Sequence, residues 1–282
     1  MIAHDAMMAP GDRHVEELAL ARALKAATQA TIVVIMPAYN AEKTLAQTYH
    51  DLPLEIVDEV IVTDDASRDG TVAVARSLGL DPIVHPRNLG YGGNQKTCYD
   101  RALALGADIV VMVHPDHQYD PRLVPEMVNP LLRGECDAVF GSRMLGGRFF
   151  EGGMPKWKFY ANVLLTAVEN VVLETYLTEC HSGFRAYSRR YLAAVSYGRN
   201  SDGFVFDAEI IIQGVCQKLK IREIPIETRY FEQASQIGFA ASVRYGLGIL
   251  AALLKYKLHR WGLWRFAFLE RAGLPSQAGN GL

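Results

Sequence analysis

The sequence carries little that marks a nucleic-acid-binding or zinc-binding protein. Its 29 basic and 31 acidic residues give a net charge of -2, so it lacks the basic excess that attracts nucleic acid. Its 4 cysteines lie far apart and form no CxxC pair. This spacing argues against a zinc ribbon, and free cysteines fit a reducing compartment. We therefore expect no nucleic-acid partner.

Long hydrophobic runs and a targeting signal are also missing. A helix that spans a bilayer needs about 20 consecutive apolar residues, and the nearest approach, residues 245–254, is too short. Charged residues precede the first apolar run, whereas a secretory signal would place an apolar region there. We therefore expect a cytoplasmic protein.

The sequence does contain enough apolar residues for a sizeable core, since 50% of its 282 residues are hydrophobic. No internal repeat and no linker divides the chain, so a single domain is the simpler interpretation. We expect residues 1–30 to form a tail, disordered over 1–12, and an accessory helix. Residues 31–235 would form the main domain, and residues 236–282 a C-terminal amphipathic helical segment.

Segments with a strand pattern alternate with segments of helical spacing. The pattern predicts strands at 31–36, 59–63, 82–85, 108–113, 138–140 and 221–230, and helices at 14–27, 41–52, 71–78, 94–105, 158–177, 207–217 and 243–264. This alternation predicts an α/β fold with a Rossmann-like, mostly parallel sheet flanked by helices. Pro225 cannot donate to a sheet, so the last strand is expected near an edge.

Polar clusters around Asn40, Asp65 and Asp116 each follow a predicted strand directly. The carboxyl ends of parallel strands meet at one edge of the sheet, where ligands bind in open α/β folds. The sequence therefore predicts one binding site at this edge.

The sharpest of these clusters is His114-Pro-Asp-His-Gln118. If its backbone stays extended, alternate residues face one side, so His114, Asp116 and Gln118 can converge on one divalent ion. Oxygen ligands suit Mg²⁺ or Mn²⁺, and a histidine favours Mn²⁺. The alternative is a polar strand end that contains a histidine by chance.

The other candidate residues each have two interpretations. Asp64 and Asp65 can accept hydrogen bonds from a base and a ribose, whereas Ser67 or Asp69 can simply cap the next helix. The glycine-rich segment 88–94 either lets the backbone pass close to a ligand or forms a plain tight turn.

Two arginines and two acids complete the set. Arg143 and Arg185 can grip phosphate, or they are ordinary surface charges. Asp207 and Glu209 lie at the start of a helix, where a carboxylate can act as a base or complement the helix dipole. A base is unnecessary if the acceptor is already an anion, such as a lipid phosphate.

The tail from 239 to 268 mixes apolar and basic residues. Such a segment can lie on a membrane surface, and a helix packed on its own core gives the same pattern.

Taken in order, these segments resemble the family-2 glycosyltransferases, and most closely the dolichyl- or polyprenyl-phosphate mannose or glucose synthase branch. The resemblance covers about residues 31–230 and is carried by Met36-Pro-Ala-Tyr-Asn40, Asp64-Asp-Ala-Ser-Arg-Asp-Gly70, Asn88-Leu-Gly90, Asp116-His-Gln118, Gly141-Ser-Arg143, Ser182-Gly-Phe-Arg185, Gly203-Phe-Val-Phe206 with Glu209, and Glu223-Ile-Pro-Ile226.

The resemblance implies a glycosyltransferase A fold and inversion at the anomeric carbon. It also implies that the nucleotide is held by Pro37, Tyr39, Asn40, Glu42 and Asp65, with Asn88 and Gly90 close by. The metal motif falls on His114, Asp116 and Gln118, and Arg143 and Arg185 would face phosphates. The candidate catalytic residues are therefore Asp116, Arg143, Arg185, Asp207 and Glu209.

The sequence departs from that branch in three places. Histidine stands at position 114 where the metal motif has aspartate, and segment 229–235 lacks the glycine and lysine expected for a polyprenyl-phosphate synthase. The transmembrane helices that some relatives carry at the C-terminus are also missing.

We therefore expect a Mn²⁺- or Mg²⁺-dependent transfer of a hexose from a UDP- or GDP-sugar. Polyprenyl phosphate is the candidate acceptor, and the protein would be peripheral at the inner face of the cytoplasmic membrane. An inactive relative that binds a nucleotide sugar or scaffolds a membrane complex is the alternative. A sugar nucleotidyltransferase would need a basic, glycine-rich loop after the first strand, which residues 36–40 do not supply. Oligomerisation is left open.

Overall fold

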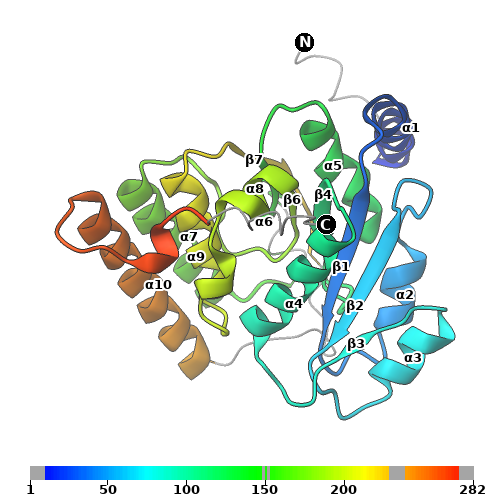
Figure 1. Ribbon diagram of the computed structural model, residues 1–282, viewed down its shortest axis with the longest axis horizontal. Coiled ribbons are helices and arrows are strands. Elements are labelled where there is room, and N and C mark those ends of the chain that lie inside the picture. The colour runs from blue at the N-terminus through cyan, green and yellow to red at the C-terminus, as the bar shows by residue number, and fades with distance from the viewer. Residues whose placement is uncertain (1–9, 148–149, 151–152, 229–238, 273–282) are drawn as a thin grey trace, which may run out of the picture.

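The computed structural model describes residues 10–147, 150, 153–228 and 239–272. Within these residues, seven strands form one sheet in the order β3-β2-β1-β4-β6-β5-β7 (Figure 1). Only β6 runs antiparallel to its neighbours β4 and β5, so the predicted mostly parallel sheet is confirmed. The strands are β1 Ile32–Ala38, β2 Glu59–Asp64, β3 Ile83–Val84, β4 Ile109–Met112, β5 Ala138–Ser142, β6 Arg185–Ser188 and β7 Ile221–Pro225.

Helices cover both faces of this sheet. They are α1 Pro10–Thr28, α2 Leu45–His50, α3 Thr71–Ser77, α4 Tyr91–Ala104, α5 Val124–Leu132, α6 Arg143–Gly146, α7 Lys156–Leu173, α8 Arg189–Ala194, α9 Phe206–Cys216 and α10 Phe239–Arg260. Figure 1 shows α7 and α10 together at the end of the molecule opposite α2 and α3. Short 3₁₀ segments, η1 Pro121–Leu123, η2 Tyr197–Arg199 and η3 Ala267–Leu269, complete the described elements.

Every residue of β1 is buried, as expected for a strand covered on both faces. Its side chains alternate between two cores because successive residues of a strand point to opposite faces. Val33 and Ile35 pack with α4, α8, α9 and α10, whereas Ile32, Val34 and Met36 pack with α2, α3 and α5. The apolar run therefore places β1 at the centre and its polar carboxyl end at the sheet edge.

Helix α4 begins at Tyr91, so the loop predicted over residues 91–93 is wrong. Gly92 and Gly93 instead lie in the first turn and donate their N–H groups to the carbonyl of Asp202. A Cβ atom on Gly92 would lie 2.5 Å from the carbonyl oxygen of Ser201. The glycines are therefore needed for a close approach of two backbones.

Several elements have no counterpart among the predictions, among them α5, α6, α8 and β6. Helix α5 contains Pro125 in its first turn and Pro130 inside, which hides it from a propensity argument. Strand β6 spans four residues and begins with Arg185, so it does not show an apolar run. The segment 182–185, predicted as a loop, therefore ends in a strand.

Other boundaries shift by a few residues. Helix α7 ends at Leu173, because Glu174 adopts a left-handed conformation with φ of 59° and stops it before 177. Strand β7 ends at Pro225 and lies at the sheet edge, as predicted from the proline. Residues 10–12 are helical, whereas the disorder predicted for 1–9 falls outside the described residues. The division at residues 30 and 235 stays a prediction.

Helix α10 packs on α7 and α9 and leaves one face in solvent. Ile249, Leu253 and Tyr256 are buried against the core, whereas Leu247 and Leu254 are exposed. None of the helices in the described ranges combines the length and the apolar character that crossing a bilayer requires. The segment is therefore amphipathic and packed on the core at the same time.

The close contact at Gly92 gives a test of the fold. Gly92→Ala is expected to lower the free energy of unfolding by about 1–3 kcal/mol, because the new methyl group would overlap the Ser201 carbonyl. Gly198→Ala is the control, since no heavy atom lies within 4 Å of its added Cβ. Its effect should stay within about 0.5 kcal/mol. Urea denaturation followed by circular dichroism measures both, and equal losses would contradict the packing described.

Candidate active site

A cavity of about 790 Å³ opens at the carboxyl ends of β1, β2, β4 and β5. Its other walls come from the start of α4, from α7 and α10, and from loops before β6 and α9. The predicted residues that line it are Pro37, Tyr39, Asn40, Asp65, Asn88, Gly90, His114, Asp116, Gln118, Arg143 and Asp207. The sheet edge therefore brings most of the predicted site into one place, whereas Glu42, Arg185 and Glu209 are not in the lining.

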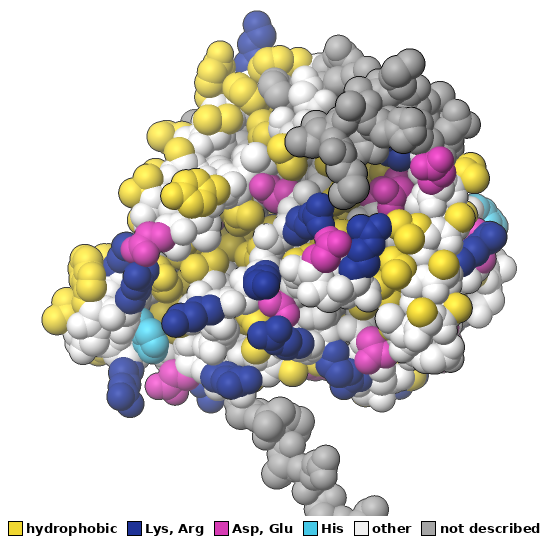
Figure 2. Space-filling view, turned by 90° about the horizontal axis from the view of Figure 1, so that it is seen from above, with side chains coloured by type: hydrophobic (Ala, Val, Ile, Leu, Met, Phe, Trp, Pro, Cys, Tyr) yellow, Lys and Arg dark blue, Asp and Glu magenta, His cyan; other side chains and the backbone are white. Residues whose placement is uncertain are grey.

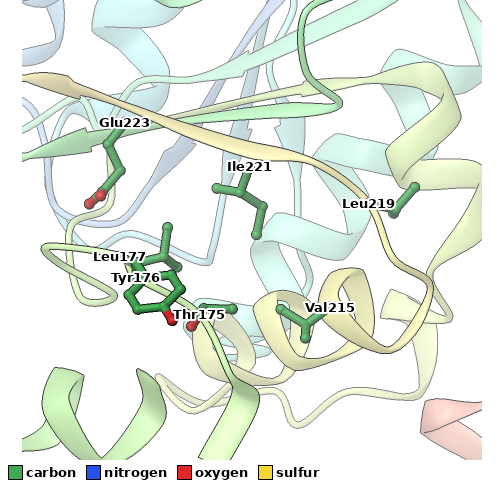
Figure 3. A pocket seen from close by; sticks show the side chains of 7 residues that line it. All are labelled: Thr175, Tyr176, Leu177, Val215, Leu219, Ile221 and Glu223. Atoms are coloured by element: carbon green, nitrogen blue, oxygen red, sulfur yellow. The ribbon is translucent and has the colours of Figure 1, made fainter. Parts of the chain in front are cut away.

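A second hollow of about 320 Å³ lies away from these residues. Figure 3 shows apolar side chains of Leu177, Val215 and Ile221 around it, with Glu223 at one side. The Glu223 carboxylate accepts hydrogen bonds from the backbone and hydroxyl of Thr178, so it is already engaged. Because this hollow has no cluster of polar groups that converge on a ligand, we place the site in the larger cavity.

Asp65 holds the loop that precedes α4. Its Oδ1 accepts from the Leu89 N–H at 2.7 Å and lies 2.8 Å from His85 Nδ1, and its Oδ2 accepts from the Gly90 N–H at 3.0 Å. Gly90 has φ of 89°, a conformation that favours glycine. Since a carboxylate oxygen has two acceptor positions, Oδ2 keeps one for a ligand. Asp65 can therefore shape the pocket and contact a nucleotide.

The turn after β2 is joined to the end of β1 through Asn40. The Asn40 N–H donates to Ser67 Oγ at 2.8 Å, and its side-chain oxygen accepts from the Arg68 N–H at 2.9 Å. Asp69 accepts from the N–H and the hydroxyl of Thr71, the first residue of α3. The later acid of the motif therefore caps the helix, whereas Asp65 lines the cavity and Asp64 accepts from the Ser67 N–H.

Glu42 belongs to this capping arrangement as well. Its carboxylate accepts from the Gly70 N–H at 2.9 Å, at the start of α3. A carboxylate at a helix N-terminus satisfies a donor that has no partner inside the helix. The structure therefore places Glu42 at the start of α3, and Glu42 is not among the residues that line the cavity.

The metal motif does not stay extended, so the geometric premise of its prediction is wrong. The backbone turns at residues 115–116, and His117 adopts φ of 57°. His117 points away to Asp51, with its Nε2 2.8 Å from Oδ2. His114, Asp116 and Gln118 nevertheless all line the cavity, because the turn presents the three from one side of the loop.

His114 is also part of a hydrogen-bond chain. Its Nε2 lies 3.2 Å from the Tyr91 hydroxyl, which itself donates to Asp207 Oδ2 at 2.8 Å. A hydroxyl has one proton, so Nε2 must carry the proton in the first of these bonds. Only Nδ1 then keeps a lone pair for an ion.

The donor set fits a hard divalent cation. Within the described residues, no group of three or more His, Cys, Asp and Glu side chains could hold a metal ion by itself. Asp116 and Gln118 supply two oxygen donors on one loop. Mg²⁺ and Mn²⁺ sites in phosphoryl chemistry use one or two protein oxygens and complete their shell with water and diphosphate oxygens. These residues therefore suit an ion that arrives with a nucleotide.

Arg185 does not face a phosphate, and that prediction is wrong. Its side chain is completely buried and donates to the carbonyls of Ser182, Cys180 and Asp207 at 2.8–3.0 Å. Its guanidinium also lies over the ring of Phe140. Arg185 therefore holds the loop before β6 and supplies a positive charge behind the cavity.

Asp207 lies at the cavity wall with its carboxylate engaged. It accepts from the Tyr91 hydroxyl and from Gln95 Nε2 at 3.2 Å, and its Oδ1 lies 3.7 Å from Arg185 Nη1. Burial and the Asp207 charge together raise the pKa of Tyr91, so this phenol stays neutral. Glu209 points elsewhere, since its carboxylate accepts from the Ser201 N–H at 2.6 Å. Both acids therefore hold parts of the fold, Asp207 at the cavity wall and Glu209 at the loop before α9.

Arg143 reaches the cavity from a buried anchor. Its Nε donates to Glu179 Oε1 at 2.6 Å, and Asn162 donates to the same oxygen at 2.7 Å. Although burial alone would raise it, the pKa of Glu179 is lowered by Arg143. Lys158 lines the same cavity, and its pKa is lowered by burial and by Arg143. Two neighbouring cations therefore make this wall suited to an anion.

Several lining residues carry no recognisable motif. Lys158, Asn162 and Leu165 follow one another at helical spacing on α7, which is the only signal that the sequence gives for them. His181 precedes β6 and Tyr245 lies in α10, far apart in the chain. Only the folded structure brings them to the cavity.

Comparison with known proteins identifies the family. The sequence model of glycosyl transferase family 2 matches residues 33–195. The chain is 30% identical over 244 residues to a UDP-N-acetylglucosamine–dolichyl-phosphate N-acetylglucosaminyltransferase of Methanococcus voltae, covering 80% of this chain and 96% of that protein. It is 31% identical over 202 residues to the low-salt glycan biosynthesis hexosyltransferase Agl6 of Haloferax volcanii, covering 70% of this chain and 47% of that protein.

A solved structure supports the same assignment of the fold. Glucosyl-3-phosphoglycerate synthase from Mycobacterium tuberculosis, in complex with Mn²⁺, uridine diphosphate and phosphoglyceric acid, superposes with a TM-score of 0.66 at 22% identity. The match covers 85% of this chain and 82% of that one. The predicted glycosyltransferase A fold is thereby confirmed, and with the family match and the 30% identical relative it leads to one conclusion: this chain belongs to glycosyl transferase family 2.

Proposed function

We propose that this protein transfers a hexose, with inversion at C1, from a UDP-sugar or GDP-sugar to polyprenyl phosphate. The observation that carries the proposal is the composition of the cavity. The cavity is lined by the oxygen donors of Asp116 and Gln118, by the segments of Asn40 and Asp65, and by the Lys158 ammonium group. A diphosphate, a metal ion and an anionic acceptor can thus bind together in this cavity.

The nucleotide side of the cavity lies at β1 and β2. Tyr39 is about half exposed there and offers a ring on which a base can stack. Asp65 Oδ2 keeps an acceptor position for a ribose hydroxyl or a base N–H. The M. voltae relative is named for UDP-N-acetylglucosamine, which supports a uridine nucleotide as the donor here.

Asp116 and Gln118 would hold Mn²⁺ or Mg²⁺ together with the donor diphosphate. When bound, such an ion neutralises the charge that develops on the leaving diphosphate. Tyr91 and Asp207 keep His114 in place behind these residues. These bonds fix the orientation of the His114 ring. Nδ1 would then be the one ring nitrogen with a lone pair for the ion.

The engaged state of Asp207 favours an acceptor that is already an anion. A phosphate monoester is mostly doubly charged at neutral pH, because its second pKa is about 6. Its oxygen can form the new bond to C1 while the bond from C1 to the diphosphate oxygen breaks. No side chain has to remove a proton in this step. Arg143 and Lys158 would attract the acceptor phosphate to the cavity.

The outer surface of α7 and α10 supports a lipid acceptor and contact with a membrane surface. Each helix buries one face and exposes an apolar stripe at helical spacing. Figure 2 shows hydrophobic side chains gathered at the end of the molecule where these helices lie. The exposed side chains are Tyr160, Val163, Leu164 and Val171 on α7 and Val243, Leu247, Leu250 and Leu254 on α10. We infer peripheral binding at the cytoplasmic face of a membrane.

Asp116→Ala is expected to reduce transfer by about 100-fold or more, because the loop loses its charged oxygen donor. Chelation with EDTA should remove activity of the unaltered protein, and Mn²⁺ or Mg²⁺ should restore it. Radiolabelled nucleotide sugars and polyprenyl phosphate measure both. Asp81→Ala, at an exposed position, is the control. Full activity of Asp116→Ala would refute the metal assignment.

The paired change Leu247→Glu with Leu254→Glu is expected to lower binding to anionic vesicles by about tenfold or more, because both side chains lie on the exposed stripe of α10. Co-sedimentation with phosphatidylglycerol vesicles measures the bound fraction. Val15→Glu, an exposed apolar position on α1, is the control and should bind like the unaltered protein. Identical binding of all three proteins would contradict membrane contact through α10.

A further inference from the structure

A buried acid on α7 meets a histidine of the cavity wall. Glu169 is fully buried, and its Oε2 lies 3.2 Å from His181 Nε2. His181 Nδ1 lies 3.0 Å from the Tyr245 hydroxyl, and both of these residues line the cavity. The three come from α7, the loop before β6 and α10, so they are a tertiary arrangement and not a local turn.

The burial of Glu169 requires a compensating group. A carboxylate without water or a cation is strongly destabilised in a protein interior. Among the described residues, His181 is the one basic side chain within ion-pair distance of it. The Cys180 thiol beside it stays neutral and adds no second negative charge, because burial and Glu169 raise its pKa well above the usual value. The Glu169 carboxylate therefore lies directly behind the His181 ring and can orient it through an ion-pair contact.

The pair presents its histidine to the cavity. Glu169 lies behind the wall, whereas the imidazole and the Tyr245 hydroxyl are at the surface of the cavity. Nε2 lies on the side of the carboxylate without a hydrogen bond to it, and Nδ1 is paired with the Tyr245 hydroxyl. The imidazole ring and the hydroxyl that it orients are therefore the polar groups that a ligand meets. These groups suit a phosphate oxygen, which accepts hydrogen bonds and prefers a positive surrounding.

The position in the cavity favours the acceptor over the donor. Lys158, Asn162, Leu165 and Glu169 recur at helical spacing on one face of α7, which places the acid in line with the cation of the cavity. The nucleotide segments lie instead on β1 and β2. The helices that carry Glu169 and Tyr245 are also those with the exposed apolar stripes.

We propose that His181 and Tyr245 bind the phosphate of the acceptor, and that Glu169 is the positioning residue that holds His181. This subsite rests on the proposed function for the identity of the acceptor. It assigns a role in acceptor affinity to three residues that lie outside the short motifs of the family resemblance.

Kinetics with varied acceptor test the subsite. His181→Ala and Tyr245→Phe should each raise KM for polyprenyl phosphate by about tenfold, since each loses a hydrogen bond to a charged group. KM for the nucleotide sugar should stay unchanged. Glu169→Gln should raise the acceptor KM by a smaller factor, and Glu169→Asp should recover part of it. His50→Ala, at an exposed histidine of α2, is the control.

Two further measurements keep the outcomes distinct. Thermal unfolding identifies any variant that fails to fold, and His181→Asn then replaces His181→Ala. The imidazole NMR signals of His181 are followed during titration with inorganic phosphate, which needs no turnover. Signals that move in the unaltered protein support the subsite even if polyprenyl phosphate proves not to be the acceptor. Unmoved signals, or an unchanged acceptor KM in folded His181 and Tyr245 variants, would overturn it.

Discussion

The shape of the cavity depends on buried carboxylates. A carboxylate that is removed from water needs hydrogen-bond donors or a positive charge beside it. Asp65 meets this requirement by fixing the backbone at Gly90, and so sets the loop that enters α4. Glu179 accepts a hydrogen bond from Arg143 and so anchors that side chain. Asp207 accepts a hydrogen bond from α4 and lies beside the positive charge of Arg185 in β6. Each wall is thus tied to another element, and the pocket is shaped before a ligand binds.

The same requirement determines which charged side chains can interact with a substrate. Asp207 accepts from two side chains of α4, and Glu209 accepts from the Ser201 N–H, so both carboxylates support the fold around the cavity. The charge of Arg143 is offset by Glu179, whereas the lowered pKa of Lys158 reflects burial and an unfavourable cation nearby. An anion that enters the cavity would relieve this repulsion. The electrostatics therefore favour two anionic substrates and disfavour a neutral alcohol that needs a base.

Apart from β6, the sequence was sufficient for the strands of the sheet and for the loops at its edge, because these follow from local pattern. The apolar runs of β1 and β4, each followed by polar residues, place Asn40 and Asp116 where the structure has them. Arg185 shows the limit, since nothing in Ser-Gly-Phe-Arg indicates that its acceptors are carbonyls buried behind the cavity. Glu169 and His181 show it again, because their contact depends on how α7 packs on the loop before β6.

Helix α7 connects the chemistry of the cavity with the outer surface. Its inner face carries Lys158 and Asn162, and its outer face exposes Tyr160 and Leu164. The two faces are separated by the diameter of one helix, about 10 Å, which is short compared with a polyprenyl chain. An acceptor with a charged head and an apolar tail would use both faces at once. A small soluble phosphate would use only the inner face and leave the apolar stripe without a role.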